Sequence, residues 1–258
     1  MFWLALAIKM VVTAAFVVVA TKTAERAGSL VGAMIATLPI AAGPSYFFLA
    51  LEHDDAFIAD GALASLVVNA VTAIFAIVYS GLAQKRGLVL SLGAALAAWF
   101  GMAALVRGLP WTTSGAVAFN VVIFMMCLLA ANWLPRVAMP PARPEWYDVP
   151  LRAGLVGLLV ALVIGLSEKL GPTVTGTLAV FPIVLVSLIL ILHPRIGGRA
   201  TASVMADTIF GLVGFSLCCL TARLLVPALG APLGLSLALA MSVGANFGIL
   251  TVRRRMRR

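Results

Sequence analysis

The sequence predicts an all-α fold, a polytopic bundle of membrane-spanning helices. The chain of 258 residues is 63% hydrophobic and only 10% charged, and its mean hydropathy is +1.13. Soluble domains carry about 25% charged residues, so this chain cannot cover its surface with polar side chains. Its apolar residues also form long runs, and a membrane-spanning helix needs about 20 consecutive, mostly apolar residues. The outer surface is therefore expected to face lipid.

Nine stretches are long enough to span a bilayer, some of them interrupted by one ionisable group. The first is predicted to be a retained helix rather than a signal peptide, because it lacks a basic amino-terminal region and carries Lys9 in its middle. The predicted spans are residues 2–21, 27–51, 57–84, 87–106, 111–134, 149–167, 172–193, 200–222 and 231–252.

The basic residues lie in the short breaks between these stretches and predict an orientation. With the carboxyl terminus in the cytoplasm, fourteen Lys and Arg residues fall on the cytoplasmic side and three on the other, as expected for membrane proteins. The acidic group Glu52, Asp54 and Asp55 then lies outside. We therefore expect a multi-pass protein of a bacterial inner membrane, with its amino terminus outside. No basic and aromatic residues interleave on a soluble domain, so nucleic acid is not an expected partner.

The sequence contains an internal repeat. Residues 25–28 (ERAG) are echoed by residues 168–171 (EKLG), an offset of 143, and the same offset matches Pro39 with Pro182. Repeat 1 is predicted to occupy residues 1–106 and repeat 2 residues 149–258, with a helix and a loop at 107–148 between them. Four helices return the chain to its starting side of the membrane, and the single joining helix moves it across. The second repeat therefore has inverted topology, as in many secondary transporters.

The same repeat pairs several polar residues. The offset of 143 matches Lys9 with Arg152. Further along, the offset falls to 138, which places Asn69 opposite Asp207.

The two prolines indicate a binding site. Pro39 and Pro182 lie deep in the spans 27–51 and 172–193. A proline inside a helix removes a backbone donor and frees a carbonyl, which in a membrane needs a partner or a water-lined cavity. Each proline is predicted either to break its helix or only to kink it. Paired interruptions in the two halves of a chain point to a substrate site.

Four ionisable residues fall within the predicted bilayer profile. Such groups usually face cavities and form pairs, because burying a charge in lipid is costly. Lys9 and Asp60 lie toward the outside, and Arg152 and Asp207 toward the cytoplasm, so two ion pairs are predicted, one in each repeat. The alternative for Arg152 and Asp60 is that they reach the membrane interface. The predicted pathway combines these four residues with Asn69, Pro39 and Pro182.

Glu25 and Glu168 each precede a predicted helix. They are expected to cap that helix, or else to be solvated loop charges or proton-coupling groups. Neither the two histidines nor the three cysteines have the spacing of a metal site. No phosphate-binding loop, zinc motif or nucleophile elbow occurs. We therefore expect no metal, no cofactor and no enzymatic activity.

Two segments carry a family resemblance: residues 32–53 (GAMIATLPIAAGPSYFFLALEH) and residues 176–198 (GTLAVFPIVLVSLILILHPRIGG). Each resembles the GlpM-type small membrane proteins, which are single-repeat, four-helix chains. The resemblance implies a fused duplication of such a unit with an added joining helix. That family is linked with exopolysaccharide production and has no established chemistry.

These observations favour a gradient-driven secondary transporter or exporter of a small solute or ion. The cationic residues of the pathway favour an anionic solute. One alternative is an accessory protein of envelope polysaccharide or lipid assembly that transports nothing itself. Others are a membrane-embedded enzyme, which would need carboxylates or histidines clustered at one depth, and a channel. The lipid bilayer is the expected environment, and the sequence leaves a homodimer open.

Overall fold

The structure is a computed structural model that describes residues 2–26, 42–137 and 145–256. Every regular element in these residues is an α-helix. Six helical stretches of the described part are long and apolar enough to cross a membrane, and α1 contains a shorter apolar stretch, Ala7–Val19. The chain is therefore a multi-pass helical membrane protein, as predicted.

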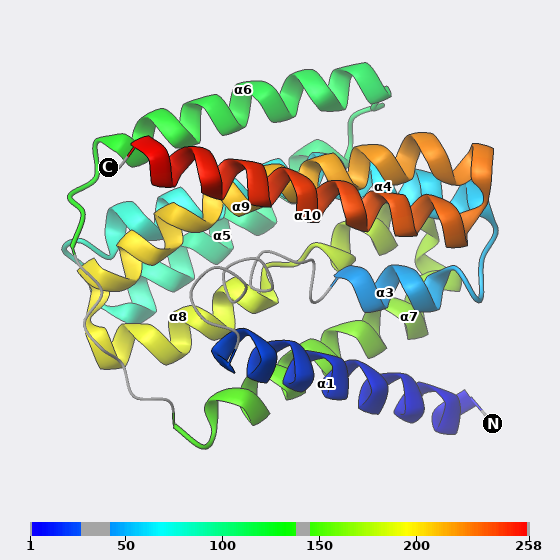
Figure 1. Ribbon diagram of the computed structural model, residues 1–258, viewed down its shortest axis with the longest axis horizontal. Helices are drawn as coiled ribbons and strands as arrows, with labels where there is room; N and C mark the ends of the chain where they lie inside the picture. The colour runs from blue at the N-terminus through cyan, green and yellow to red at the C-terminus, as the bar shows by residue number, and fades with distance from the viewer. Residues whose placement is uncertain (1, 27–41, 138–144, 257–258) are drawn as a thin grey trace.

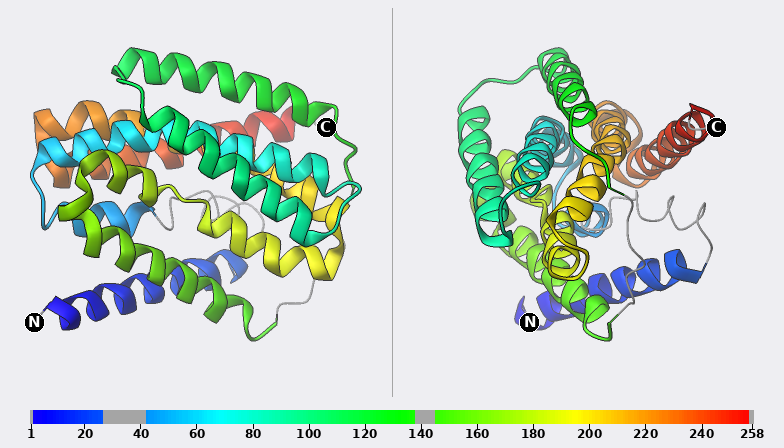
Figure 2. Two further views of the ribbon diagram at one scale, coloured as in Figure 1. Left: turned by 180° about the vertical axis from the view of Figure 1, so that it is seen from behind. Right: turned by 90° about the vertical axis from the view of Figure 1, so that its left-hand side faces the viewer.

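The helices lie side by side along the long axis of the molecule (Figure 1). α4 and α9 lie near its middle, α1 and α7 lie together on one side, and α6 lies on the opposite side (Figure 2). The start of α1 and the end of α10 lie at opposite ends of the bundle (Figure 1). The elements are α1 (Phe2–Arg26), α3 (Ala42–Leu49), α4 (Asp55–Leu82), α5 (Leu88–Arg107), α6 (Thr113–Asn132), α7 (Asp148–Ala179), α8 (Ile183–Ile196), α9 (Gly198–Leu229) and α10 (Ala231–Met256).

The described helices match most of the predicted spans, but some boundaries differ. α9 continues to Leu229 instead of ending at residue 222, and only Gly230, with φ 80°, separates it from α10. α7 consists of two helical segments joined at Gly171, which has φ 71° and ψ 174°. Positive φ is readily available to glycine alone, so Gly171 makes a sharp bend without a loop. Of the predicted span 27–51, only residues from Ala42 onward are described.

Two pairs of helix starts have the offset of 143 residues found in the sequence. The first residues of α4 and α9, Asp55 and Gly198, are 143 positions apart, and so are those of α5 and α10, Leu88 and Ala231. The predicted correspondence of Asn69 with Asp207, at an offset of 138, stays a prediction.

Helix α4 packs against α5, α6, α7 and α9 and is the best covered of the spans. It lies very close to α7 at one point. A Cβ atom added to Gly176 would collide with the backbone of Gly61, so the two helices touch at their main chains. Small residues permit such contacts between membrane helices, where packing and hydrogen bonds drive association.

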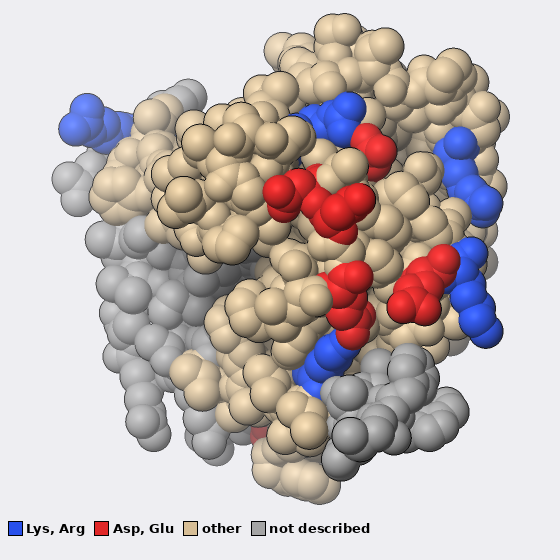
Figure 3. All heavy atoms as spheres, turned by 90° about the vertical axis from the view of Figure 1, so that its right-hand side faces the viewer, with Lys and Arg blue, Asp and Glu red and all other residues tan. Residues whose placement is uncertain are grey.

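Two turns at one end of the bundle are joined by acidic residues. Asp54 caps α4, its carboxylate accepting a hydrogen bond of 2.8 Å from the Phe57 N–H. Asp55 accepts a hydrogen bond of 2.9 Å from the N–H of Ala231, the first residue of α10. Acidic side chains gather on this end face (Figure 3). The turn between α3 and α4 is thereby fixed to the start of α10, and these helices form walls of the cavity described next.

Candidate functional site

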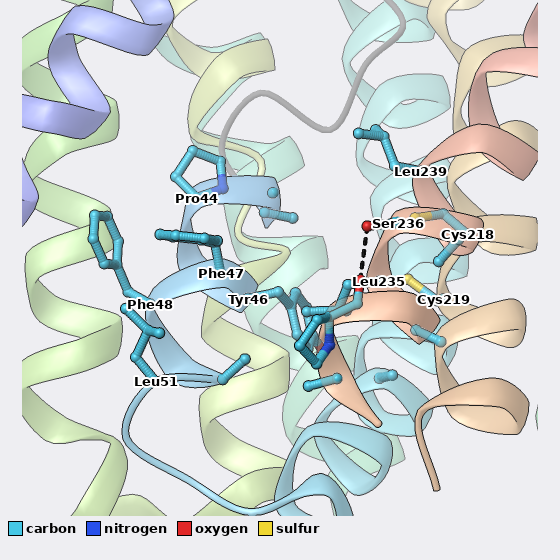
Figure 4. Close-up of a pocket in the computed structure, with 18 of the residues that line it drawn as sticks. Pro44, Tyr46, Phe47, Phe48, Leu51, Cys218, Cys219, Leu235, Ser236 and Leu239 are labelled. Carbon is cyan, nitrogen blue, oxygen red and sulfur yellow. Dashed lines mark hydrogen bonds between the residues drawn. The ribbon is translucent and has the colours of Figure 1, made fainter. Parts of the chain in front are cut away.

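A cavity of about 550 Å³ lies between α1, α3, α4, α9 and α10. Aromatic and aliphatic side chains from α3 and α10 and the sulfur atoms of α9 surround it (Figure 4). Ligand sites usually enclose about 300–1,000 Å³ and are lined mainly by apolar groups. Six of the residues around it are Phe16, Tyr46, Phe47, Cys218, Leu235 and Leu239.

The wall of this cavity is almost entirely apolar. Among the described residues that line it, none is charged, and the hydroxyl groups come from Thr13, Tyr46 and Ser236. The Ser236 hydroxyl donates to the Pro232 carbonyl within its own helix, at 2.7 Å (Figure 4). The Thr13 hydroxyl is buried and has no hydrogen-bond partner in the described part of the chain. The cavity therefore offers a large apolar volume with few hydrogen-bonding groups.

The rim of the cavity is apolar as well. Phe47 of α3 is 59% exposed, and Phe16 and Leu239, of α1 and α10, are 46% and 44% exposed. In a membrane-embedded bundle such exposed apolar side chains face lipid, because no hydrophobic penalty attaches to them there. The cavity is thus bordered by exposed apolar side chains.

An ion pair lies at the acidic end of the cavity. The Lys9 ammonium group binds the carboxylate of Glu52. Its nitrogen lies 5.9 Å from the centre of the Phe48 ring, which lines the cavity, and Glu52 directly follows Leu51, another lining residue. The lysine side chain is only 15% exposed. Lys9 is thus partly buried, at the boundary between the apolar cavity and the polar end face.

The predicted partner of Lys9, Asp60, binds elsewhere. Asp60 of α4 pairs with Arg223 of α9 at 2.5 Å, and its side chain is 54% exposed. The predicted pair Lys9–Asp60 is therefore wrong. Spacing along a helix gave the depth of each charge, but the neighbour across the bundle depends on how the helices pack.

A short hydrogen-bonded chain connects the cavity to α7. The Tyr46 hydroxyl lies 2.7 Å from the Ser65 hydroxyl, and Ser65 donates to the Gly176 carbonyl at 2.8 Å. Tyr46 and Ser65 are both buried. Since Gly176 also touches Gly61 of α4, the cavity wall is firmly coupled to the second segment of α7.

That segment leads into a break in the helix. α7 ends at Ala179, Val180 and Pro182 have non-helical backbone angles, and α8 begins at Ile183. The Phe181 ring packs edge-on against Trp99 at 5.1 Å between ring centres. Of the two alternatives for Pro182, the break is confirmed. Pro39 lies outside the described residues.

Asn69 belongs to a buried polar network at the centre of the bundle. Its amide group donates to the Leu212 carbonyl at 2.7 Å and to the Ser216 hydroxyl at 2.8 Å. Ser216 donates to the side-chain carbonyl of Asn120 at 2.7 Å, and Asn120 donates to the Leu66 carbonyl at 2.9 Å. The network joins α4, α6 and α9 and is not part of the cavity wall. Ser216 was not among the predicted pathway residues, because a single serine in an apolar run does not indicate a polar network.

Asp207 lies at the other end of the bundle from the cavity. It binds Arg136 at 2.5 Å and Arg253 at 2.6 Å, so the predicted pairing of Asp207 with Arg152 is wrong. Arg195 of α8 forms two hydrogen bonds, of 2.5 and 2.7 Å, with Asp148 at the start of α7. Two of the ion pairs thus connect a helix with the end of the next described helix: Lys9 of α1 binds Glu52 just after α3, and Asp148 of α7 binds Arg195 of α8. Their partners differ from those predicted.

The remaining predicted groups lie away from the cavity. Arg152 lies near the start of α7, and Glu168 is exposed in the last turn before Gly171. Because Glu168 is itself helical, it does not occupy the capping position predicted for it. Glu25 lies in the last turn of α1, and its side chain is outside the described part. No group of three or more potential metal-ligating side chains occurs among the described residues.

Comparison of the chain with protein-family models, with curated proteins and with solved structures finds no match. The function therefore has to be inferred from the arrangement of the chain's own residues.

Proposed function

We propose that this protein is a secondary transporter or exporter of a small molecule, driven by a proton or ion gradient. The observation that carries the proposal is the cavity of about 550 Å³, whose wall is hydrogen-bonded through Tyr46 and Ser65 to a helix that breaks at Pro182. Discontinuous helices next to a binding site are a recurring feature of secondary transporters.

The proposed architecture is two inverted repeats of four spans joined by α6. In its favour, α4 and α9, and likewise α5 and α10, begin 143 residues apart. α1 packs against α7, and α4 packs against α9, so each of these helices contacts its own counterpart, as two halves related by a twofold axis would. The resemblance to a duplicated GlpM-type unit predicts the same division. We propose nine crossings, with the amino terminus outside.

Ion pairs at both ends of α9 supply the gates of such a transporter. Asp60 and Arg223 join α4 to α9 at the acidic end. At the other end Asp207 of α9 binds Arg136, beyond α6, and Arg253 of α10. Alternating access opens one end at a time, often by rocking one repeat against the other. Each opening movement then breaks the ion pairs at one end, either those of Asp60 or those of Asp207. Protonation of that aspartate is a means of coupling the movement to a proton gradient.

The proposal is tested by flux measurements in proteoliposomes with a broad panel of solutes and imposed proton and sodium gradients. We expect gradient-dependent movement of at least one solute. Pro182→Ala, which lets α7 and α8 join, should reduce the flux by about tenfold, the effect of about 1.4 kcal/mol on a barrier. Pro227→Ala is the matched control, because Pro227 lies within α9 without interrupting it.

Two results would contradict the proposal. If the folded protein moves no solute under any gradient but co-purifies stably with an envelope synthase, the accessory role replaces transport. If Pro182→Ala transports as well as wild type, the helix break has no part in the mechanism. Reporters fused to both chain ends test the topology separately, since an odd number of crossings requires opposite compartments.

A further inference from the structure

We infer that the substrate is an amphiphile, with one apolar chain that occupies the cavity and a small polar head at the Lys9–Glu52 pair. This inference rests on the proposed function and names its substrate class. It takes the place of the small anionic solute that the cationic residues of the predicted pathway favoured.

The composition of the described part of the wall disfavours a hydrophilic solute. A polar group moved out of water without a hydrogen-bond partner costs roughly 1–3 kcal/mol in proteins, and an unpaired charge costs much more. Against this, the described part of the wall provides only the Thr13 and Tyr46 hydroxyls, because the Ser236 hydroxyl is bonded within its own helix. An apolar chain pays no such penalty and fits a volume of about 550 Å³.

The route of entry is lateral, from the bilayer. α1 packs against α7, whereas α10 packs against α9, so the helices on the two sides of the cavity are held by different partners. The exposed rings of Phe16 and Phe47 and the side chain of Leu239 form the rim. Among the described residues of this rim, a chain from the surrounding lipid therefore meets apolar side chains on its way to the cavity.

The position of the head follows from the charges at the cavity's acidic end. Lys9 and Glu52 neutralise each other there, beside the lining residues Phe48 and Leu51. A charged head group takes the place of one member of this ion pair and binds the other. Removing one member therefore sets the charge preference: Glu52→Gln leaves a free ammonium group, which selects an anionic head, and Lys9→Gln leaves a free carboxylate, which selects a cationic one.

The experiment is photo-crosslinking of the full-length protein in lipid nanodiscs. It uses two diazirine-bearing probes of the same chain length, a fatty acid and an alkyl trimethylammonium compound. Labelled residues are mapped by mass spectrometry. We expect saturable labelling of Ala42–Leu51 and Phe215–Ala222, which excess unlabelled probe suppresses. Labelling of the outer helix faces should not saturate, because those positions contact bulk lipid.

Variants that fill the cavity are compared with a variant outside it. Ala222→Trp, in the wall, and Ser236→Trp, at an exposed position of the lining, should each lower the saturable labelling by about tenfold. Ala104→Trp, exposed on α5 and outside the cavity, should leave it unchanged. Ser236→Trp keeps the test valid if the buried variant fails to fold. Glu52→Gln should shift the ratio of the two probes toward the fatty acid, and Lys9→Gln toward the trimethylammonium compound.

The inference is overturned if labelling of the cavity segments does not saturate, or if it persists in both filled variants. It is also overturned if the two charge variants leave the probe ratio unchanged. Because the measurement needs no gradient, it separates the two proposals. Saturable labelling without flux of any solute refutes transport but supports the amphiphile site. Flux of a hydrophilic solute without cavity labelling supports transport but refutes the amphiphile site.

Discussion

The two sides of α4 are built in opposite ways. On one side α4 meets α7 and α9 through main-chain contact at Gly61 and Gly176 and through the hydrogen bonds of Asn69 and Ser216. On the other side, toward α1, α3 and α10, lies the cavity of about 550 Å³. In lipid the hydrophobic effect does not drive helices together, so close fit and polar contacts hold the first side closed. The second side has the Tyr46–Ser65 and Asp55–Ala231 hydrogen bonds, but it leaves an apolar cavity between the helices that can admit a ligand.

The strongest test of this contrast is Gly176→Ala. The added methyl group would meet the Gly61 backbone, which cannot move away by rotating a side chain. Overpacking of this kind costs about 1–3 kcal/mol or more, so we expect a large loss of folded protein, measured by unfolding in sodium dodecyl sulfate. Gly154→Ala, at an open position on the same helix, is the control. Equal stability of the two variants would refute the tight crossing.

A smaller effect is expected in the buried polar network. A double-mutant cycle with Asn69→Ala and Ser216→Ala isolates their hydrogen bond, which is 2.8 Å long. Interhelical hydrogen bonds in membranes contribute about 0.6 kcal/mol on average and up to about 1.7 kcal/mol. The same unfolding assay should give a coupling energy in that range. A coupling indistinguishable from zero would leave close packing as the sole cause of the contact.

The ion pair at the border of the two sides should contribute less. Asp60 is 54% exposed where it binds Arg223, and exposed pairs contribute about 0–1 kcal/mol. Asp60→Asn should therefore change stability little, while it weakens the proposed gate. The check is a comparison of unfolding with solute flux in the same preparation. A stability loss equal to that of Gly176→Ala would make Asp60 a structural residue.

The smallest effect is expected within the cavity itself. Ser236→Leu adds apolar volume at an exposed lining position, and its lost hydrogen bond is local to α10. We expect a change in unfolding free energy within about 0.5 kcal/mol, as for surface substitutions. A strong destabilisation would show that the cavity side is as closely packed as the crossing.

The sequence predicted what depends on local chemistry. Long apolar runs predicted most helices within a few residues. Pro182 indicated an interruption, as either a break or a kink, because a missing N–H is a property of the residue itself. The ion pairs were predicted with the wrong partners, because Lys9 and Glu52 are 43 positions apart and only the folded bundle brings them together. The cavity gave no signal at all, since its lining residues have the composition of any membrane helix.

The hydrogen-bonded chain from Tyr46 to Gly176 fixes the direction of every proton within it. A carbonyl cannot donate, so the single hydroxyl hydrogen of Ser65 is committed to Gly176, and the hydrogen between the two hydroxyls comes from Tyr46. The phenol oxygen retains only lone pairs. Any group of a bound molecule that meets this oxygen must bring its own hydrogen, which makes an alcohol, an amine or an amide a better match than an ether or a carboxylate.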